Sequence, residues 1–167
     1  MKIDLKILKT SETAQFESLI SIFHDVFDMQ PTEEASTAHL HKLLRRDSFL
    51  VMVATADDEV IGGLTIYLLD QYYSEKPLAY VYDFAIVEQY QRKGIGKQLM
   101  DFANAYCKKI GAQEAYVEAG QADINAVSFY RATKPSKEEE VLHFSYDLEN
   151  DQTWQLLYNR HHRDKMN

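Results

Sequence analysis

Several features that mark secreted or membrane-spanning proteins are missing from this chain of 167 residues. It has one cysteine, Cys107, which excludes an internal disulfide framework and suits a reducing compartment. No apolar run approaches the length of a membrane span. The first ten residues alternate polar and apolar side chains, unlike the core of a signal peptide. We therefore expect a cytoplasmic protein with no membrane partner.

Positive charge is also in short supply. The chain has 18 Lys and Arg residues against 26 Asp and Glu, a formal net charge of −8. The phosphates of a nucleic acid would be repelled by this charge, so we expect no nucleic-acid partner. Two interpretations of the acidic excess stay open: it favours a cationic partner, or it simply keeps the protein soluble.

Neither internal repeats nor low-complexity segments occur, and the 46% hydrophobic and 26% charged residues are typical of a globular protein. A chain of this length suits one ordinary domain. We expect a single domain over residues 1–150. Residues 151–167 are expected to be a short C-terminal extension, with a turn or two of helix.

The periodicity of apolar residues predicts alternating strands and helices. Alternation and short apolar runs predict strands at residues 2–8, 49–55, 60–69, 78–87, 115–119 and 141–147. Apolar spacings of three and four predict helices at residues 13–27, 35–44, 94–110 and 125–131. Antiparallel strands followed by a strand–helix–strand unit predict an α+β (mixed α/β) fold, with a mixed sheet and helices on both faces.

One loop between a strand and a helix has the properties of a phosphate site. It reads Gln91-Arg92-Lys93-Gly94-Ile95-Gly96-Lys97. Glycines allow close approach of the backbone to a ligand, and the first turn of a helix presents unpaired N–H groups to an anion. A glycine pair alone is equally consistent with an ordinary turn.

Flanking segments give the loop a more specific meaning. The strand before it ends in Asp83-Phe84-Ala85-Ile86-Val87, and Asn125-Ala126-Val127-Ser128-Phe129-Tyr130 follows downstream. The loop and both segments resemble motifs of the GNAT acetyltransferase superfamily. That resemblance covers about residues 1–147 and implies the GNAT fold, a twisted and mostly antiparallel sheet, with acetyl-CoA as co-substrate. A nucleotide P-loop is disfavoured because no Gly-Lys-Ser/Thr ending is present.

Within that superfamily the chain is most similar to aminoglycoside 3-N-acetyltransferases. The matching segments are Tyr82-Asp83-Phe84-Ala85, Tyr116-Val117-Glu118-Ala119 and Glu140-Val141-Leu142-His143-Phe144. The resemblance implies a homodimer and a small polycationic amine as acceptor. In that family a Leu-Gly turn follows the tyrosine equivalent to Tyr130, whereas this chain has Arg131 and Ala132 there.

The resemblance also implies roles for the backbone around the loop. The loop amides would hold the pyrophosphate, and the strand end would pair with the pantetheine arm, with the N–H of Ile86 polarising the thioester carbonyl. Asn125 would cap its helix or bond the pantetheine amides. The residues predicted to bind acetyl-CoA are Phe84, Ala85, Ile86, Val87, Gln91, Arg92, Lys93, Gly94, Ile95, Gly96, Lys97 and Asn125.

Three side chains are predicted to be catalytic. Asp83 is the first candidate for the base, because a carboxylate in an apolar strand is costly without a reason; Glu118 is the second. Tyr130 is the candidate acid for the leaving thiolate. Alternation along the strand predicts that Tyr82 and Phe84 point to the face opposite Asp83.

No metal site is expected, because the six histidines show no ligand spacing with acidic or cysteine partners. Two other functions stay open. The acceptor could be a different amine, such as a polyamine, an amino acid or an amine of a peptide or protein. The chain could also be a non-catalytic module that only binds acyl-CoA.

Overall fold

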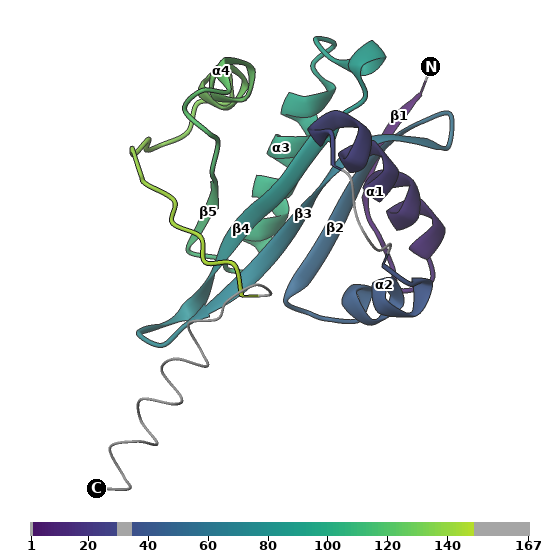
Figure 1. Ribbon diagram of the computed structural model, residues 1–167. Coiled ribbons are helices and arrows are strands. Elements are labelled where there is room, and N and C mark those ends of the chain that lie inside the picture. The colour runs from purple at the N-terminus through teal and green to yellow at the C-terminus, as the bar shows by residue number, and fades with distance from the viewer. Residues whose placement is uncertain (1, 30–34, 149–167) are drawn as a thin grey trace, which may run out of the picture. The chain divides into compact units, whose positions relative to one another are not determined.

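The computed structural model describes residues 2–29 and 35–148 (Figure 1). The chain divides into two compact units, Met1–Lys134 and Pro135–Asn167. The predicted single domain to residue 150 stays a prediction. The predicted extension at residues 151–167 lies outside the described residues.

The first unit is built on a five-stranded sheet. Its strands lie in the order β1-β2-β3-β4-β5, and all neighbours are antiparallel except β4 and β5, which are parallel. The strands are β1 (Ile3–Ile7), β2 (Phe49–Ala56), β3 (Glu59–Gln71), β4 (Ser74–Ile86) and β5 (Glu114–Val117). The mixed, mostly antiparallel sheet is confirmed.

Helices cover both faces of this sheet, as the sequence predicts. The helices are α1 (Thr13–Phe27), α2 (Thr37–Leu44), α3 (Ile95–Lys109) and α4 (Ile124–Ala132), with a short 3-10 helix at η1 (Glu88–Tyr90). Figure 1 shows α1 and α2 on one face and α3 on the other. Among residues 2–29 and 35–148, no helix has the length and apolar character needed to cross a membrane.

Alternation along β2 divides the hydrophobic core between these two faces. Val51 and Val53 pack on the side of α1, in a cluster with Leu19, and all three are fully buried. Met52 lies on the opposite side, in a cluster with Leu99 of α3. Since both faces of β2 are covered, the strand reads as a continuous apolar run in the sequence.

The strand predicted at residues 141–147 is wrong. Within the part of the second unit that the structure describes, residues 135–148, no strand is formed. The apolar side chains that suggested it are exposed: Val141, Leu142, Phe144 and Tyr146. Alternation shows that a segment has one apolar face, but a strand also needs the backbone groups of a partner, which the pattern does not supply.

Gly63 offers a test of the packing between β3 and α1. A Cβ on Gly63 would lie 2.5 Å from the carbonyl oxygen of Met52 and 2.8 Å from the Leu19 side chain. Because a backbone carbonyl cannot move aside cheaply, we expect Gly63→Ala to lower the free energy of unfolding by about 1–3 kcal/mol. Urea unfolding measures this change.

Gly120→Ala is the matched control, because a Cβ there meets no atom within 4 Å. It should change the stability by less than about 0.5 kcal/mol. Equal stability of the two variants would contradict the packing described for Gly63.

Candidate active site

An irregularity in β4 sets the direction of the predicted base. Opposite β3, Val81 pairs with Ile66 and Phe84 pairs with Leu64, so Tyr82 and Asp83 together face one β3 residue, Thr65. This is a β-bulge. The Asp83 N–H donates to the Thr65 hydroxyl over 3.3 Å.

The bulge changes which side chains share a face. Val81 and Phe84 both pack toward the core beneath α3, although they are three residues apart. Tyr82 lies against Tyr67, and the charge of Asp83 acts on the same Tyr67 hydroxyl. Phe84 therefore points away from Asp83 as predicted. The prediction for Tyr82 is wrong, because the extra residue of the bulge puts it on the Asp83 face.

The same part of β4 has an open edge. Pairing with β5 ends at Val81 and Val117, so residues 82–86 continue without β5 beside them. The N–H of Val87 donates to Ile61 of β3 over 2.9 Å. Backbone groups alternate in direction along a strand, so Ala85 also faces β3 while Phe84 and Ile86 face the open edge. Of the four residues predicted to pair with pantetheine through their backbone, Phe84 and Ile86 therefore face the open edge, whereas Ala85 and Val87 face β3.

The predicted loop is fastened to the end of this strand. The side-chain amide of Gln91 donates to the Ile86 carbonyl over 2.8 Å. Arg92 has a φ of 57° and Gly94 a φ of 78°, both in the left-handed region. Arginine adopts this conformation at a cost of about 1 kcal/mol or more, and strain of this kind collects at functional sites.

Helix α3 begins with its amide groups open. Gly94 is the N-cap and supplies no side-chain cap, and the first helical bond runs from the Gln98 N–H to the Gly94 carbonyl over 3.0 Å. The N–H groups of the first turn therefore have no helical acceptor and suit an anion. A Cβ on Gly96 would lie 3.1 Å from the Phe129 ring, so glycine here lets α3 approach α4 closely.

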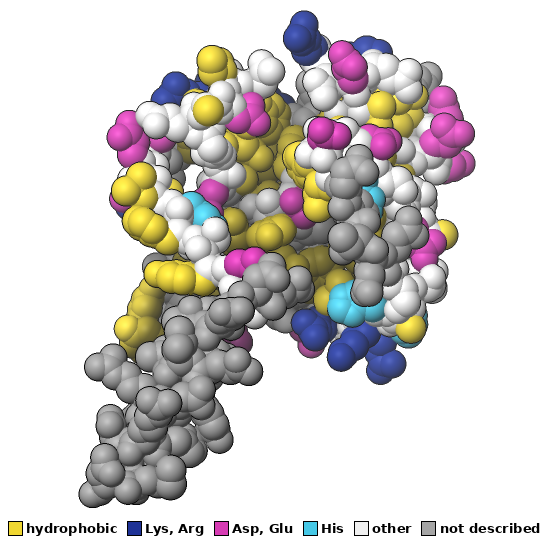
Figure 2. Space-filling view, in the orientation of Figure 1, with side chains coloured by type: hydrophobic (Ala, Val, Ile, Leu, Met, Phe, Trp, Pro, Cys, Tyr) yellow, Lys and Arg dark blue, Asp and Glu magenta, His cyan; other side chains and the backbone are white. Residues whose placement is uncertain are grey.

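The loop carries three cations, Arg92, Lys93 and Lys97, and two of them have neighbours within the protein. Lys97 forms an ion pair with Asp101 over 2.7 Å, and the Lys93 ammonium lies 5.5 Å from the centre of the Tyr90 ring. Figure 2 shows acidic side chains dispersed over this face, with Lys and Arg side chains near α2 and also at the top of the molecule. The exposed side chains of Arg92, Lys93 and Lys97 therefore add positive charge beside the backbone amides of the loop.

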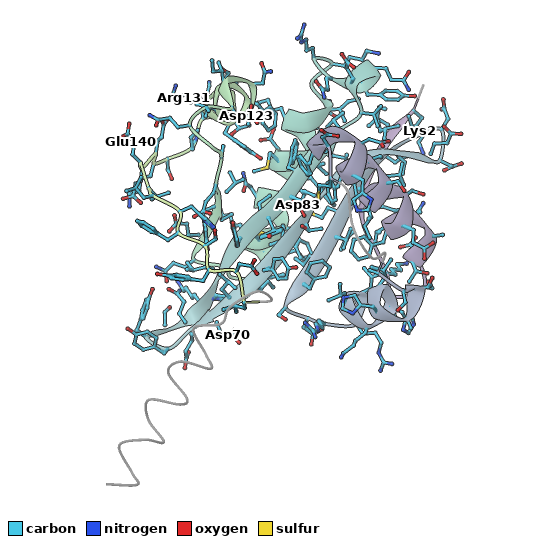
Figure 3. All side chains as sticks on the ribbon, in the orientation of Figure 1. Lys2, Asp70, Asp83, Asp123, Arg131 and Glu140 are labelled. Carbon is cyan, nitrogen blue, oxygen red and sulfur yellow. The ribbon has the colours of Figure 1, made fainter. Side chains whose placement is uncertain are left out.

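Asp83 has the properties of a base. Its side chain is half-buried, and this burial raises the pKa of its carboxyl above the ordinary value of 3.8. Figure 3 shows Asp83 near the middle of the sheet, between α1 and α4. A carboxylate with a raised pKa holds a proton more strongly, and so removes one from a substrate more readily.

Tyr130 comes to the same place from α4. Its ring contacts Phe129 and Phe84, at 5.1 Å and 6.3 Å between ring centres. Burial, followed by the charges of Asp123 and Asp83, raises the pKa of Tyr130 to about 12. The structure therefore brings two of the predicted catalytic side chains, Asp83 and Tyr130, within electrostatic reach of one another.

Glu118 is held differently. It is the first residue after β5, its side chain is exposed, and it accepts a hydrogen bond of 3.1 Å from the hydroxyl of Tyr80. The Glu118 carboxylate is exposed, whereas the Asp83 carboxylate is half-buried beside the open edge of β4. The geometry therefore favours Asp83 over Glu118 for proton removal.

Asn125 lies on the first turn of α4 with its side chain exposed. The N-cap of α4 is Asp123, whose carboxylate accepts from the N–H of Ala126 over 2.9 Å. The proposal that Asn125 caps this helix is therefore wrong, and its contact with pantetheine stays a prediction. An Asp just before the expected helix start is the signal that could have identified the cap.

Three features of the site have no signal in the sequence that we could read. They are the bulge at Tyr82 and Asp83, the bond from Gln91 to Ile86, and the bond from Tyr80 to Glu118. Each depends on strand register or on a side-chain contact across elements, which local patterns do not encode.

The chain belongs to the acetyltransferase (GNAT) family, whose model matches residues 16–133. It is an acetyltransferase, and this family uses an acyl-CoA co-substrate. No curated protein matches the chain.

Several solved structures are similar to this chain. An aminoglycoside acetyltransferase, meta-AAC0020 from an uncultured soil metagenomic sample, is 43% identical with a TM-score of 0.85, covering 87% of this chain and 96% of its own. HMB0005, also an aminoglycoside acetyltransferase from such a sample, is 29% identical with a TM-score of 0.83, over 89% and 99%. A ribosomal-protein-alanine N-acetyltransferase from Brucella melitensis shares the fold, at 14% identity, a TM-score of 0.69 and coverage of 87% and 100%.

The two left-handed glycines at the ends of α3 allow a matched test of the loop. Gly94→Ala and Gly111→Ala each force alanine into a positive φ, 78° and 82°, so both should strain the protein by about 1 kcal/mol. Only Gly94 lies in the loop, so only Gly94→Ala should weaken acyl-CoA binding, by about tenfold. Isothermal titration with acetyl-CoA measures the affinity.

Thermal unfolding of both variants provides the control for strain. Equal loss of acetyl-CoA affinity in the two variants would show that the loop has no special role in binding.

Proposed function

We propose that this protein transfers the acetyl group of acetyl-CoA to a primary amine of an aminoglycoside-type acceptor, as a 3-N-acetyltransferase, by direct attack in a ternary complex. The observation that carries this proposal is the position of Asp83. It is a half-buried carboxylate with a raised pKa, on a bulge beside an open strand edge and within electrostatic reach of Tyr130. The homodimer that the resemblance implies stays a prediction.

Acetyl-CoA would bind along the open edge of β4. The backbone groups of Phe84 and the N–H of Ile86 face this edge and would bond the pantetheine arm, as a strand added to a sheet; the Ile86 carbonyl already accepts from Gln91. The N–H of Ile86 would donate to the thioester oxygen and stabilise the negative charge that develops there. The pyrophosphate would lie on the loop amides and the first turn of α3.

Asp83 would prepare the acceptor. An amine attacks only with a free lone pair, so its proton must leave at or before attack. The ammonium gives one proton to the Asp83 carboxylate, and its nitrogen then bonds to the carbonyl carbon. The nitrogen, now positively charged, loses a second proton to solvent, and the tetrahedral intermediate collapses with loss of the thiolate. The products are an amide and CoA.

Tyr130 would stabilise the leaving sulfur. With its pKa at about 12, the phenol keeps its proton at neutral pH. A thiol of pKa about 8.5 is the stronger acid, so complete transfer from the phenol would cost about 5 kcal/mol. The role that fits these values is a hydrogen bond donated by Tyr130 to the thiolate, which solvent then protonates.

The choice of acceptor is supported by relatives and by charge. Structures of meta-AAC0020 have been determined in complex with sisomicin and in complex with trehalose. In this chain the acidic side chains Asp83 and Glu118 lie at the two strands that flank the open edge, and the net charge of −8 attracts a polycation.

Replacing the base tests the mechanism. We expect Asp83→Asn to lower kcat/KM for sisomicin by about 10²–10⁴-fold while acetyl-CoA affinity stays unchanged, because the carboxylate acts on the acceptor's proton. Release of CoA thiol measures turnover. Unchanged turnover in the variant would remove Asp83 from this role.

The activity of the wild type should rise with pH as Asp83 ionises. This rise should occur at a higher pH than for an ordinary aspartate, because burial raises the pKa of Asp83.

Removing the Tyr130 hydroxyl tests its proposed hydrogen bond to the leaving thiolate. Tyr130→Phe keeps the ring contacts and should lower kcat by about 10–100-fold, with little change in the KM for acetyl-CoA. Tyr106→Phe, at a half-buried tyrosine of α3, is the control and should leave kcat within about twofold. If the two variants behave alike, Tyr130 has no part in thiolate release.

A further inference from the structure

Four tyrosines form a continuous row of ring contacts across the sheet. Tyr67 of β3 meets Tyr82 of β4 at 5.5 Å between ring centres, Tyr82 meets Tyr80 at 5.6 Å, and Tyr80 stacks on Tyr116 of β5 at 4.8 Å. Tyr67 also contacts the buried ring of Phe49 at 4.9 Å. This tyrosine row is therefore anchored in the core at one end and reaches β5 at the other.

The tyrosine row presents ring surface to solvent beside the base. The exposed fraction is 57% for Tyr82 and 37% for Tyr67, high values for side chains of a central sheet. Asp83 adjoins Tyr82 in the bulge and its charge acts on Tyr67, so carboxylate and rings share one face. Exposed aromatic rings next to a catalytic group are suited to bind the apolar face of a substrate.

Glu118 is fixed at the β5 end of the row. The Tyr80 hydroxyl donates to one oxygen of its carboxylate over 3.1 Å, and Tyr80 is itself held by stacking on Tyr116 at an interplanar angle of 9°. Since β5 ends at Val117, Glu118 has no strand to hold it in place. The hydrogen bond therefore orients a carboxylate that would otherwise rotate freely, and its second oxygen can accept from an ammonium.

We propose that the tyrosine row binds a ring of the acceptor, and that Glu118, positioned by Tyr80, binds an ammonium group other than the one acetylated at Asp83. This inference rests on the proposed function and deepens it. The favoured acceptors are rigid ring systems that carry at least two amines, and Tyr80 is a positioning residue that acts through Glu118.

The physical argument separates three classes of amine. A rigid ring diamine gains ring stacking and two charge contacts without losing conformational freedom. A flexible linear polyamine meets both carboxylates but loses rotamer entropy when it is bound. A monoaminated sugar stacks on the row but has no second ammonium for Glu118.

Steady-state kinetics with three acceptors test the selection. We expect kcat/KM to be at least about tenfold higher for sisomicin than for spermidine, a linear polyamine, or for glucosamine, a sugar with one amine. Similar values for all three would overturn the acceptor inference and leave the proposed function standing. Turnover with none of these or other amines would overturn the proposed function itself.

Tyr80→Phe tests the positioning role, because it keeps the ring and removes only the hydroxyl. We expect the KM for sisomicin to rise about tenfold, the effect of losing a hydrogen bond that orients a charged group, with kcat within about twofold. The KM for glucosamine should change by less than about twofold. Tyr106→Phe is the control, because this half-buried tyrosine lies on α3 and outside the row, and it should leave the KM for sisomicin within about twofold.

A double-mutant cycle separates this role from a merely structural one. In a Glu118→Ala background, which removes the acceptor of the Tyr80 hydroxyl, Tyr80→Phe should raise the KM for sisomicin by less than about twofold further, because either change abolishes the positioned carboxylate. Additive effects, or a loss of kcat in place of a rise in KM, would contradict the positioning role.

Tyr82→Leu tests the rings directly. It should lower kcat/KM for sisomicin and glucosamine, about fivefold each, and leave the value for spermidine within about twofold. An equal loss for all three acceptors would contradict ring recognition by the row.

Discussion

The site depends on one interruption of backbone pairing in the sheet. Strand β5 leaves β4 after Val81, and the bulge at Tyr82 and Asp83 begins at the next residue. Because β5 ends there, the amides of Phe84 and Ile86 face an open edge. The bulge places the Asp83 side chain on the same face as Tyr82. In a regular sheet a neighbouring strand would bond these amides, and the side chains of Tyr82 and Asp83 would lie on opposite faces. The open edge for acyl-CoA and the position of the base therefore both depend on this one interruption.

The surrounding structure stabilises this interruption. The Gln91 side chain bonds the Ile86 carbonyl, Val87 continues the ladder to β3, and Phe84 stacks on Phe129 of α4 at 5.1 Å between ring centres. A half-buried carboxylate and an arginine in a left-handed conformation both reduce stability. Asp83 in β4 and Arg92 in the loop after η1 have the local structure expected where function, not stability, decides the conformation.

Most of the helices and strands, and the residues of the candidate site, could be predicted from the sequence. The features that could not be predicted have physical reasons. The loop at Gln91–Gly96 and the carboxylate at Asp83 were visible because glycine pairs and a charged residue in an apolar strand are local signals. The bulge was not, because strict alternation assumes equal numbers of residues on both strands. The bond from Tyr80 to Glu118 depends on the parallel register of β4 and β5, to which the sequence gives no guide. The strand predicted at residues 141–147 failed because alternation does not supply a partner.

Hydrogen exchange of single backbone amides tests the central claim most directly, namely that acyl-CoA adds to the open edge of β4. The amides of Phe84 and Ile86 should exchange at least about tenfold more slowly when acetyl-CoA is added, because they gain a hydrogen-bond acceptor. The amides of Ala85 and Val87, which already face β3, should change little. Protection of the loop alone, with Phe84 and Ile86 unchanged, would contradict the account.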